Sequence, residues 1–306
     1  MRTKLFITST LLIFFLVNTS YGQSFVFRVL ASKGANQVKK GQSGETIPLK
    51  TGATLMSGDE LIAASGAYIG LMHKSGRTIE VRNPGVTKIT DLETKLAKSQ
   101  SSVANKYAQF VMNKMQGEGE SSNYRRNMKA TGAVERATAS ASLKVLLPSS
   151  VDILNPEAII RWEGASEVED ASYVVSIKNI FDEEIYSAET TDTSLNINFE
   201  DDNLANERLV ILNVQVKDND ELKSGDYGIK RMSADDAASI NENLLALKSE
   251  IAEDSPLNNL IFASFYEEND LILDAMTQYE KALIASPDVE DFKTIYNDFL
   301  AKNGLK

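Results

Sequence analysis

Histidine and cysteine, which serve most often as catalytic bases, thiol nucleophiles and zinc ligands, are nearly absent from this chain. It has one histidine, His73, and no cysteine. A hydroxyl nucleophile needs a paired base, and no G-x-S-x-G turn accompanies this histidine. Zinc sites draw on several His or Cys ligands. We therefore interpret His73 as a turn or surface residue, and we assign no catalytic, cofactor-binding or metal-ligating residue.

Carboxylates are abundant, and two clusters of them fall in expected inter-strand loops, at residues 200–202 and 218–221. Such hard oxygen ligands suit Ca²⁺, although Leu222 and Lys223 depart from the EF-hand pattern. A pair of carboxylates is also the equipment of a glycosidase. Calcium binding, cleavage of envelope glycans and plain solvated loop charge all stay open for these residues.

The first 22 residues have the pattern of a secretory signal peptide. Arg2 and Lys4 precede an apolar run from residue 5 to 17, and small residues lie near Gly22. The run is shorter than the roughly 18 to 20 apolar residues of a spanning helix, so we expect cleavage, with an uncleaved N-terminal anchor as the alternative. The mature chain is then expected in the periplasm, the cell envelope or the secreted fraction of a Gram-negative bacterium, without disulfides or a lipoprotein anchor.

Charge is divided unevenly along the chain. Residues 23–144 hold 18 Lys and Arg against 9 Asp and Glu, a net of +9, and residues 145–306 hold 12 against 34, a net of −22. A basic front attracts polyanions, but its lysines and arginines are not interleaved with aromatic residues as in a nucleic-acid binder. We expect no nucleic-acid partner. The candidate partners are proteins or anionic envelope polymers, including the acidic half of a second copy.

Residues 23–89 are expected to form an all-β domain. Short apolar strands alternate there with turns at Gly52, Gly58, Gly66 and Gly76, where the backbone needs φ above zero or a close approach. In this order of strands and glycine turns, residues 24–89 resemble the FecR-type periplasmic domain.

Two segments with different patterns follow this domain. Residues 90–115 carry apolar side chains near helical spacing and predict one amphipathic helix. Residues 116–142 are small, polar and basic without a period, which is typical of a flexible linker. Such a linker lets the two halves of the chain move independently.

Residues 143–232 carry short strands at the spacing of a β-sandwich. The pattern resembles a fibronectin type III domain, and the single tryptophan, Trp162, would match the core anchor of an early strand. We interpret Trp162 as a packing residue rather than a ligand-stacking one.

Residues 233–306 are expected to be helical, with Ser233 as the N-cap of a first helix. Residues 255–287 resemble one tetratricopeptide repeat. The residues at the offsets of that family are Phe262, Ala263, Tyr266, Ala275, Tyr279, Ala282 and Pro287. A third helix is expected through Phe292 and Phe299. Because solenoids usually need about three repeats, we expect a small helical bundle rather than a full peptide-binding solenoid.

The sequence thus predicts a multidomain β and α protein, with an all-β FecR-like module, a β-sandwich and a C-terminal helical bundle. FecR-type proteins pass contacts from an outer-membrane transporter through a membrane helix, whereas here a signal peptide stands in place of that helix. The resemblance therefore predicts a non-enzymatic binding or adaptor protein of the cell envelope. The alternative is a periplasmic sensor subunit that relays ligand occupancy to a membrane-bound regulator.

Overall fold

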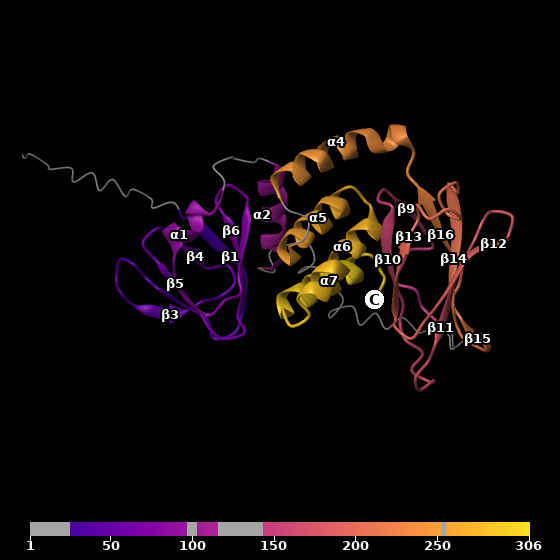
Figure 1. Ribbon diagram of the computed structural model, residues 1–306, viewed down its shortest axis with the longest axis horizontal. Coiled ribbons are helices and arrows are strands. Elements are labelled where there is room, and N and C mark those ends of the chain that lie inside the picture. The colour runs from indigo at the N-terminus through magenta and orange to yellow at the C-terminus, as the bar shows by residue number, and fades with distance from the viewer. Residues whose placement is uncertain (1–24, 97–102, 116–142, 252–254) are drawn as a thin grey trace, which may run out of the picture.

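The computed structural model describes residues 25–96, 103–115, 143–251 and 255–306. The predicted signal peptide and the predicted linker at 116–142 lie outside these residues. The described parts form a β domain, a helical layer and a second β domain along the long axis of the molecule (Figure 1). The C-terminal helices therefore lie in the middle of the molecule, between two β domains that precede them in the sequence. The mixed β and α class is confirmed.

The N-terminal β domain consists of two antiparallel four-stranded sheets, in the orders β4-β1-β6-β7 and β3-β2-β5-β8. The strands are β1 (Phe27–Lys33), β2 (Gln37–Lys39), β3 (Thr46–Pro48), β4 (Thr54–Leu55), β5 (Glu60–Ala63), β6 (Tyr68–His73), β7 (Thr78–Val81) and β8 (Gly85–Lys88). Leu55, Leu61 and Ile69 are among the fully buried side chains of its core.

The single helix expected over residues 90–115 is divided between two parts of the molecule. α1 (Ile89–Thr94) buries Ile89 and Leu92 in the core of the β domain, while α2 (Val103–Met115) buries Tyr107 and Val111 among the other helices. α1 ends at the C-cap residue Lys95. The prediction of one continuous helix was wrong because its apolar positions serve two separate cores.

The second β domain has a two-stranded sheet, β10-β13, and a larger sheet in the order β12-β11-β14-β16-β9, with β15 paired to β14. Its strands are β9 (Ser150–Ile153), β10 (Glu157–Arg161), β11 (Tyr173–Lys178), β12 (Glu184–Thr190), β13 (Ser194–Asn198), β14 (Leu209–Val216), β15 (Asn219–Lys223) and β16 (Tyr227–Arg231). Trp162 is 2% exposed and contacts Tyr173 edge to face. Its predicted role in packing is confirmed.

The helical layer contains α2 together with α4 (Ala234–Glu250), α5 (Pro256–Glu268), α6 (Ile272–Ala285) and α7 (Glu290–Lys302). Ser233 caps α4 as predicted, because its side chain accepts a hydrogen bond from the backbone N–H of Asp236. Every residue of α5 from Pro256 to Glu267 is buried. A helix that is buried along its whole length is surrounded by protein, so α5 is the central element of the helical layer.

Both β domains contact this layer directly. From the N-terminal domain, the Glu80 carboxylate on β7 accepts hydrogen bonds from the Ser255 hydroxyl (2.5 Å) and the Leu257 backbone N–H (3.0 Å), at the first turn of α5. Burial alone would raise the pKa of Glu80, but these hydrogen bonds outweigh it and lower that pKa. A carboxylate from another domain thus completes the N-terminal cap of the central helix, and independent motion of the two halves would break this contact.

The β6–β7 turn makes a second contact between the N-terminal β domain and the helical layer. Gly76, in the β6–β7 turn, has φ of 88°, and a Cβ at this position would lie 2.3 Å from the Cα of Asn105 on α2. No side chain fits there, so the turn approaches the helix at backbone distance.

A single buried carboxylate joins three helices to α5. Glu267 pairs with Lys114 of α2 and with Lys302 of α7 (3.2 Å), and the Tyr279 hydroxyl of α6 donates to it (3.0 Å). Its side chain is 2% exposed. Burial alone would raise the pKa of Glu267, but the two lysines lower it.

We expect Glu267→Gln to lower the free energy of unfolding by about 3 to 5 kcal/mol, because the variant leaves the Lys114 ammonium buried without a counter-charge. Urea unfolding of the mature protein measures this effect. The matched control is Glu268→Gln on the same helix. Glu268 is 40% exposed and pairs with Lys106 at the surface, so its loss should cost at most about 1 kcal/mol. Equal losses for the two variants would contradict the role given to Glu267.

Candidate functional site

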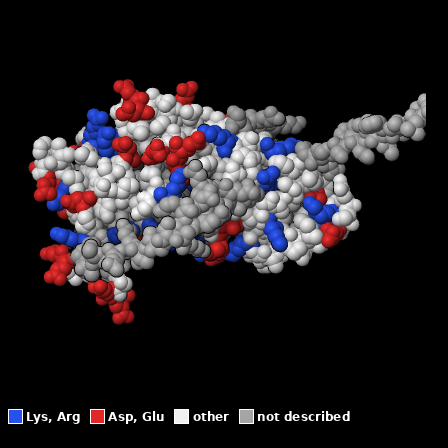
Figure 2. Space-filling model, turned by 180° about the vertical axis from the view of Figure 1, so that it is seen from behind, with Lys and Arg blue, Asp and Glu red and all other residues white. Residues whose placement is uncertain are grey.

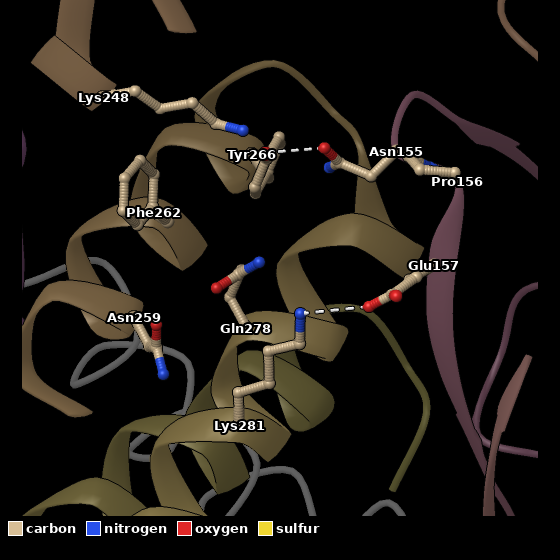
Figure 3. Close-up of a pocket in the computed structure, with 9 residues that line it drawn as sticks. All are labelled: Asn155, Pro156, Glu157, Lys248, Asn259, Phe262, Tyr266, Gln278 and Lys281. Atoms are coloured by element: carbon tan, nitrogen blue, oxygen red, sulfur yellow. Dashed lines mark hydrogen bonds and ion pairs between the residues drawn. The ribbon is translucent and has the colours of Figure 1, made fainter. Parts of the chain in front are cut away.

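A cleft of about 460 Å³ lies where the helical layer meets the second β domain. Its volume is within the range of about 300 to 1,000 Å³ that small-molecule and peptide-fragment sites occupy. Figure 3 shows the side chains around it, which come from three helices and from the β9–β10 turn. They are Asn155, Pro156, Glu157, Lys248, Asn259, Phe262, Tyr266, Gln278 and Lys281.

Helix α5 contributes Asn259, Phe262 and Tyr266, which share one helical face by their spacing. The two aromatic residues are almost completely buried, so they form the floor of the cleft. Asn259 is 7% exposed, and its carboxamide makes no side-chain hydrogen bond to another residue that the structure describes. Its carboxamide reaches the open cleft, so Asn259 can supply both donors and an acceptor to a molecule there.

The β9–β10 turn is held over the cleft by hydrogen bonds to two helices. Asn155 accepts from the Tyr266 hydroxyl (3.2 Å) through Oδ1 and donates to Asp274 (2.5 Å) through Nδ2. The Asp274 carboxylate also accepts from the backbone N–H groups of Leu154 (3.0 Å) and Asn155 (2.9 Å). The turn therefore keeps a fixed position relative to α5 and α6.

Charged side chains lie at the rim of the cleft. Lys281 on α6 is 3.8 Å from Glu157 on β10, and both side chains are partly exposed. Lys248, near the end of α4, reaches toward the cleft from the opposite side (Figure 3). Together with Asn259 and Gln278, these residues can bind an anionic group and neighbouring hydrogen-bonding groups.

One face of α6 covers the outer edge of β10. Thr277 accepts the backbone N–H of Ile159 (3.0 Å), and Glu280 pairs with Arg161 through two hydrogen bonds. An uncovered strand edge would leave such N–H groups unpaired. Asp274, Thr277 and Glu280 are one helical turn apart, so a single polar stripe joins the helical layer to the second β domain.

His73 lies at the end of β6, and its ring is part of a turn. Its Nδ1 accepts from the backbone N–H of Ser75 (3.2 Å) and lies 2.7 Å from the Ser75 hydroxyl oxygen, and its Nε2 lies 3.5 Å from Glu93. Partial burial lowers the pKa of His73. Because two atoms of Ser75 contact one ring nitrogen, the His73 ring packs against the β6–β7 turn at the end of its strand. The pairing with Ser75 and Glu93 was not foreseen from the sequence.

The acidic loops carry exposed carboxylates. Residues 200–202 follow β13. Of residues 218–221, only Asp218, with φ of 61°, lies in the β14–β15 turn; residues 219–221 belong to β15, so the loop expected there was wrong for these three. Within the described ranges, no group of three or more His, Cys, Asp and Glu residues is placed to hold a metal ion. None of the helices in those ranges is long and apolar enough to cross a membrane.

Most of the cleft residues were missed by the sequence analysis, which identified only Phe262 and Tyr266, as residues of the helical seam. Asn155, Glu157 and Lys281 look like ordinary surface residues in the sequence, and they meet only when α6 docks on the second β domain. In comparisons with known proteins, no family model matches the chain, and no curated protein matches it.

Burial raises the pKa of Asp274 to about 6 from 3.8, although hydrogen bonds from N–H groups of Leu154, Asn155 and Asp274 itself oppose the shift. The native state then holds this proton more tightly than the unfolded state does. The contribution of Asp274 to stability is therefore largest below about pH 4 and decreases by about 3 kcal/mol as the pH rises through 6.

We expect the stability of wild type relative to Asp274→Asn to decrease between pH 4 and pH 7, since the variant cannot titrate at this position. Urea unfolding of both proteins across this pH range gives the difference between their free energies of unfolding. The contributions of the many surface carboxylates are the same in both proteins and cancel. Any hydrogen bond weakened by the substitution changes the stability difference equally at every pH. Only the titration of Asp274 makes that difference depend on pH. A flat or rising difference would contradict the assignment.

Proposed function

We propose that this chain is a non-enzymatic binding and adaptor protein of the bacterial cell envelope, and that the cleft between α4, α5, α6 and the β9–β10 turn holds its ligand. The observation that carries the proposal is the lining of this cleft, where the carboxamides of Asn259 and Gln278 lie beside two lysines and the buried aromatic floor. A concave site with an aromatic floor and a few polar groups at its walls is typical of sites that bind another molecule.

The partner is a protein or an anionic envelope polymer. Lys248 and Lys281 supply positive charge in a half of the chain that is otherwise strongly acidic. An anionic group on the partner would compete with Glu157 for Lys281, whose ion pair is long and partly exposed. Export by the signal peptide at residues 1–22 would bring the cleft to proteins and polymers of this kind.

Three family resemblances belong to the proposal. A FecR-type module at residues 24–89 would engage one partner, and the tetratricopeptide-like hairpin of α5 and α6 would engage another. The repeat is supported by the burial of Ala263, Ala275 and Ala282 where the two helices meet. The fibronectin type III-like middle domain is supported by its paired sheets and by Trp162 in the core. The adaptor role follows from the helical layer, which contacts both β domains.

Site-specific photo-cross-linking tests this function. A photoreactive amino acid replaces Gln278 in the cleft, and a matched variant carries it at Leu245 on α4, which is 68% exposed. We expect irradiation of living cells to give a discrete adduct with an envelope protein or polymer from position 278 and not from position 245.

The charge of the ligand is tested on the same adduct. Lys248→Glu should reduce the yield of the adduct several-fold. With purified envelope material, the yield should also decrease as salt rises from about 0.01 to 0.1 M, because the Debye length decreases from about 30 to 10 Å over this range. Equal labelling from positions 278 and 245, or no labelling at all, would contradict the proposed function.

A further inference from the structure

Two large apolar side chains are exposed next to each other at the tip of the β11–β12 hairpin. Ile180 is 60% exposed and Phe181 is 77% exposed. Single exposed apolar residues are common on protein surfaces. A neighbouring pair at a hairpin tip is less common, because a short turn gains nothing from apolar residues unless they are covered by a partner.

The turn that carries them is built by specific hydrogen bonds. Asn179 is buried, and its Oδ1 accepts from the backbone N–H groups of Phe181 (2.9 Å) and Glu183 (3.1 Å). Its Nδ2 donates to the Glu183 carboxylate (2.8 Å), and Asp182 adopts φ of 66°. The turn therefore presents Ile180 and Phe181 to solvent in a fixed conformation, which lowers the entropy cost of binding through them.

The charge around the tip defines the partner. Asp182, Glu183 and Glu184 follow directly and are exposed, and residues 143–232 hold 19 Asp and Glu against 8 Lys and Arg. Figure 2 shows acidic side chains gathered toward the end of the molecule that this domain occupies. Anionic lipid would be repelled by these carboxylates. A fitting surface combines an exposed apolar residue with lysine or arginine.

The N-terminal β domain of the same chain presents such a surface. Val86 on β8 is 65% exposed. In the sequence it lies between Arg82 and Lys88, and no acidic residue occurs from 82 to 88. Arg82 pairs within the chain with Glu80 (3.0 Å) and Ser286 (3.1 Å), so Lys88 is the exposed cation on β8 itself. Residues 25–96 hold 10 Lys and Arg against 6 Asp and Glu. Among the described strands β8 pairs only with β5, so its other edge can accept a further strand.

We propose that the β11–β12 hairpin of one copy docks on the β8 edge of a second copy. Phe181 covers Val86, and Asp182 to Glu184 approach Lys88. The two surfaces differ, so the contact is heterologous, and they belong to β domains at opposite ends of the molecule (Figure 1). Contacts of this type extend into open chains of molecules rather than closed dimers. The proposal is independent of the cleft and of its ligand.

Sedimentation velocity of the mature protein, residues 23–306, tests the contact. Small interfaces bind weakly, so the protein is compared from about 5 to about 500 µM, at salt of about 0.01 M and of about 0.5 M. We expect the mean sedimentation coefficient to rise with concentration at low salt and to stay at the monomer value at high salt. A monomer at every concentration at low salt would overturn the proposal.

Two variants identify the surfaces. Phe181→Asp removes the tip and Val86→Asp removes the receiving edge, and each lies at an exposed position. Each variant alone should stay monomeric. An equimolar mixture should form dimers and nothing larger, since each pair retains one intact tip and one intact edge. Leu245→Asp, at an exposed apolar position on α4, should associate like wild type.

Three results would overturn the assignment of the surfaces. In the first, Phe181→Asp associates as strongly as wild type. In the second, the mixture of the two variants remains monomeric while wild type associates. In the third, Leu245→Asp loses association to the same extent as the other two variants. Flotation with vesicles containing anionic lipid tests the other occupant. If wild type floats with the vesicles, Phe181→Asp does not, and the protein is monomeric in solution, the hairpin tip binds a membrane instead of a second copy.

Discussion

The ion pair between Glu267 and Lys114 lies at the centre of the molecule, and the arrangement of the helices depends on it. Both groups are almost completely removed from water. Removing either one therefore leaves an uncompensated charge in the interior. Lys302 and Tyr279 complete the shell around the carboxylate. The position of α5 is thereby fixed relative to α2, α6 and α7, and both β domains are placed by their contacts with this layer.

Apolar packing and polar contacts together join the helical layer to the two β domains, and several of the polar contacts satisfy backbone groups that would otherwise be unpaired. Glu80 completes the first turn of α5, and Asp274 and Thr277 accept backbone N–H groups along the β9–β10 segment. Such contacts depend on direction as well as distance. They fix orientation more strictly than apolar packing alone, and the cleft at Asn259 takes its shape from them.

Local features were predicted from the sequence where one short segment determines them. The cap at Ser233, the buried face of the helix through Phe292 and Phe299, and the core position of Trp162 follow from spacing and residue type. The relative placement of the domains was beyond sequence reasoning. Glu80 and Glu280 look like solvated charges until Leu257 and Arg161, far away in the sequence, are brought beside them. Periodicity also joined α1 and α2 into one helix, because it cannot tell which core an apolar residue enters.

The most direct test of this account is the distance between the two β domains in solution. The chain has no cysteine, so Lys50→Cys and Asp220→Cys, at exposed positions in the two domains, introduce the only sites for a pair of spin labels. Pulsed electron–electron double resonance on dilute protein at high salt then reports the distribution of that distance. The account predicts one narrow distribution, which broadens when Glu267→Gln is added. A broad distribution in the otherwise unchanged protein would contradict the claim that the helical layer holds both domains in place.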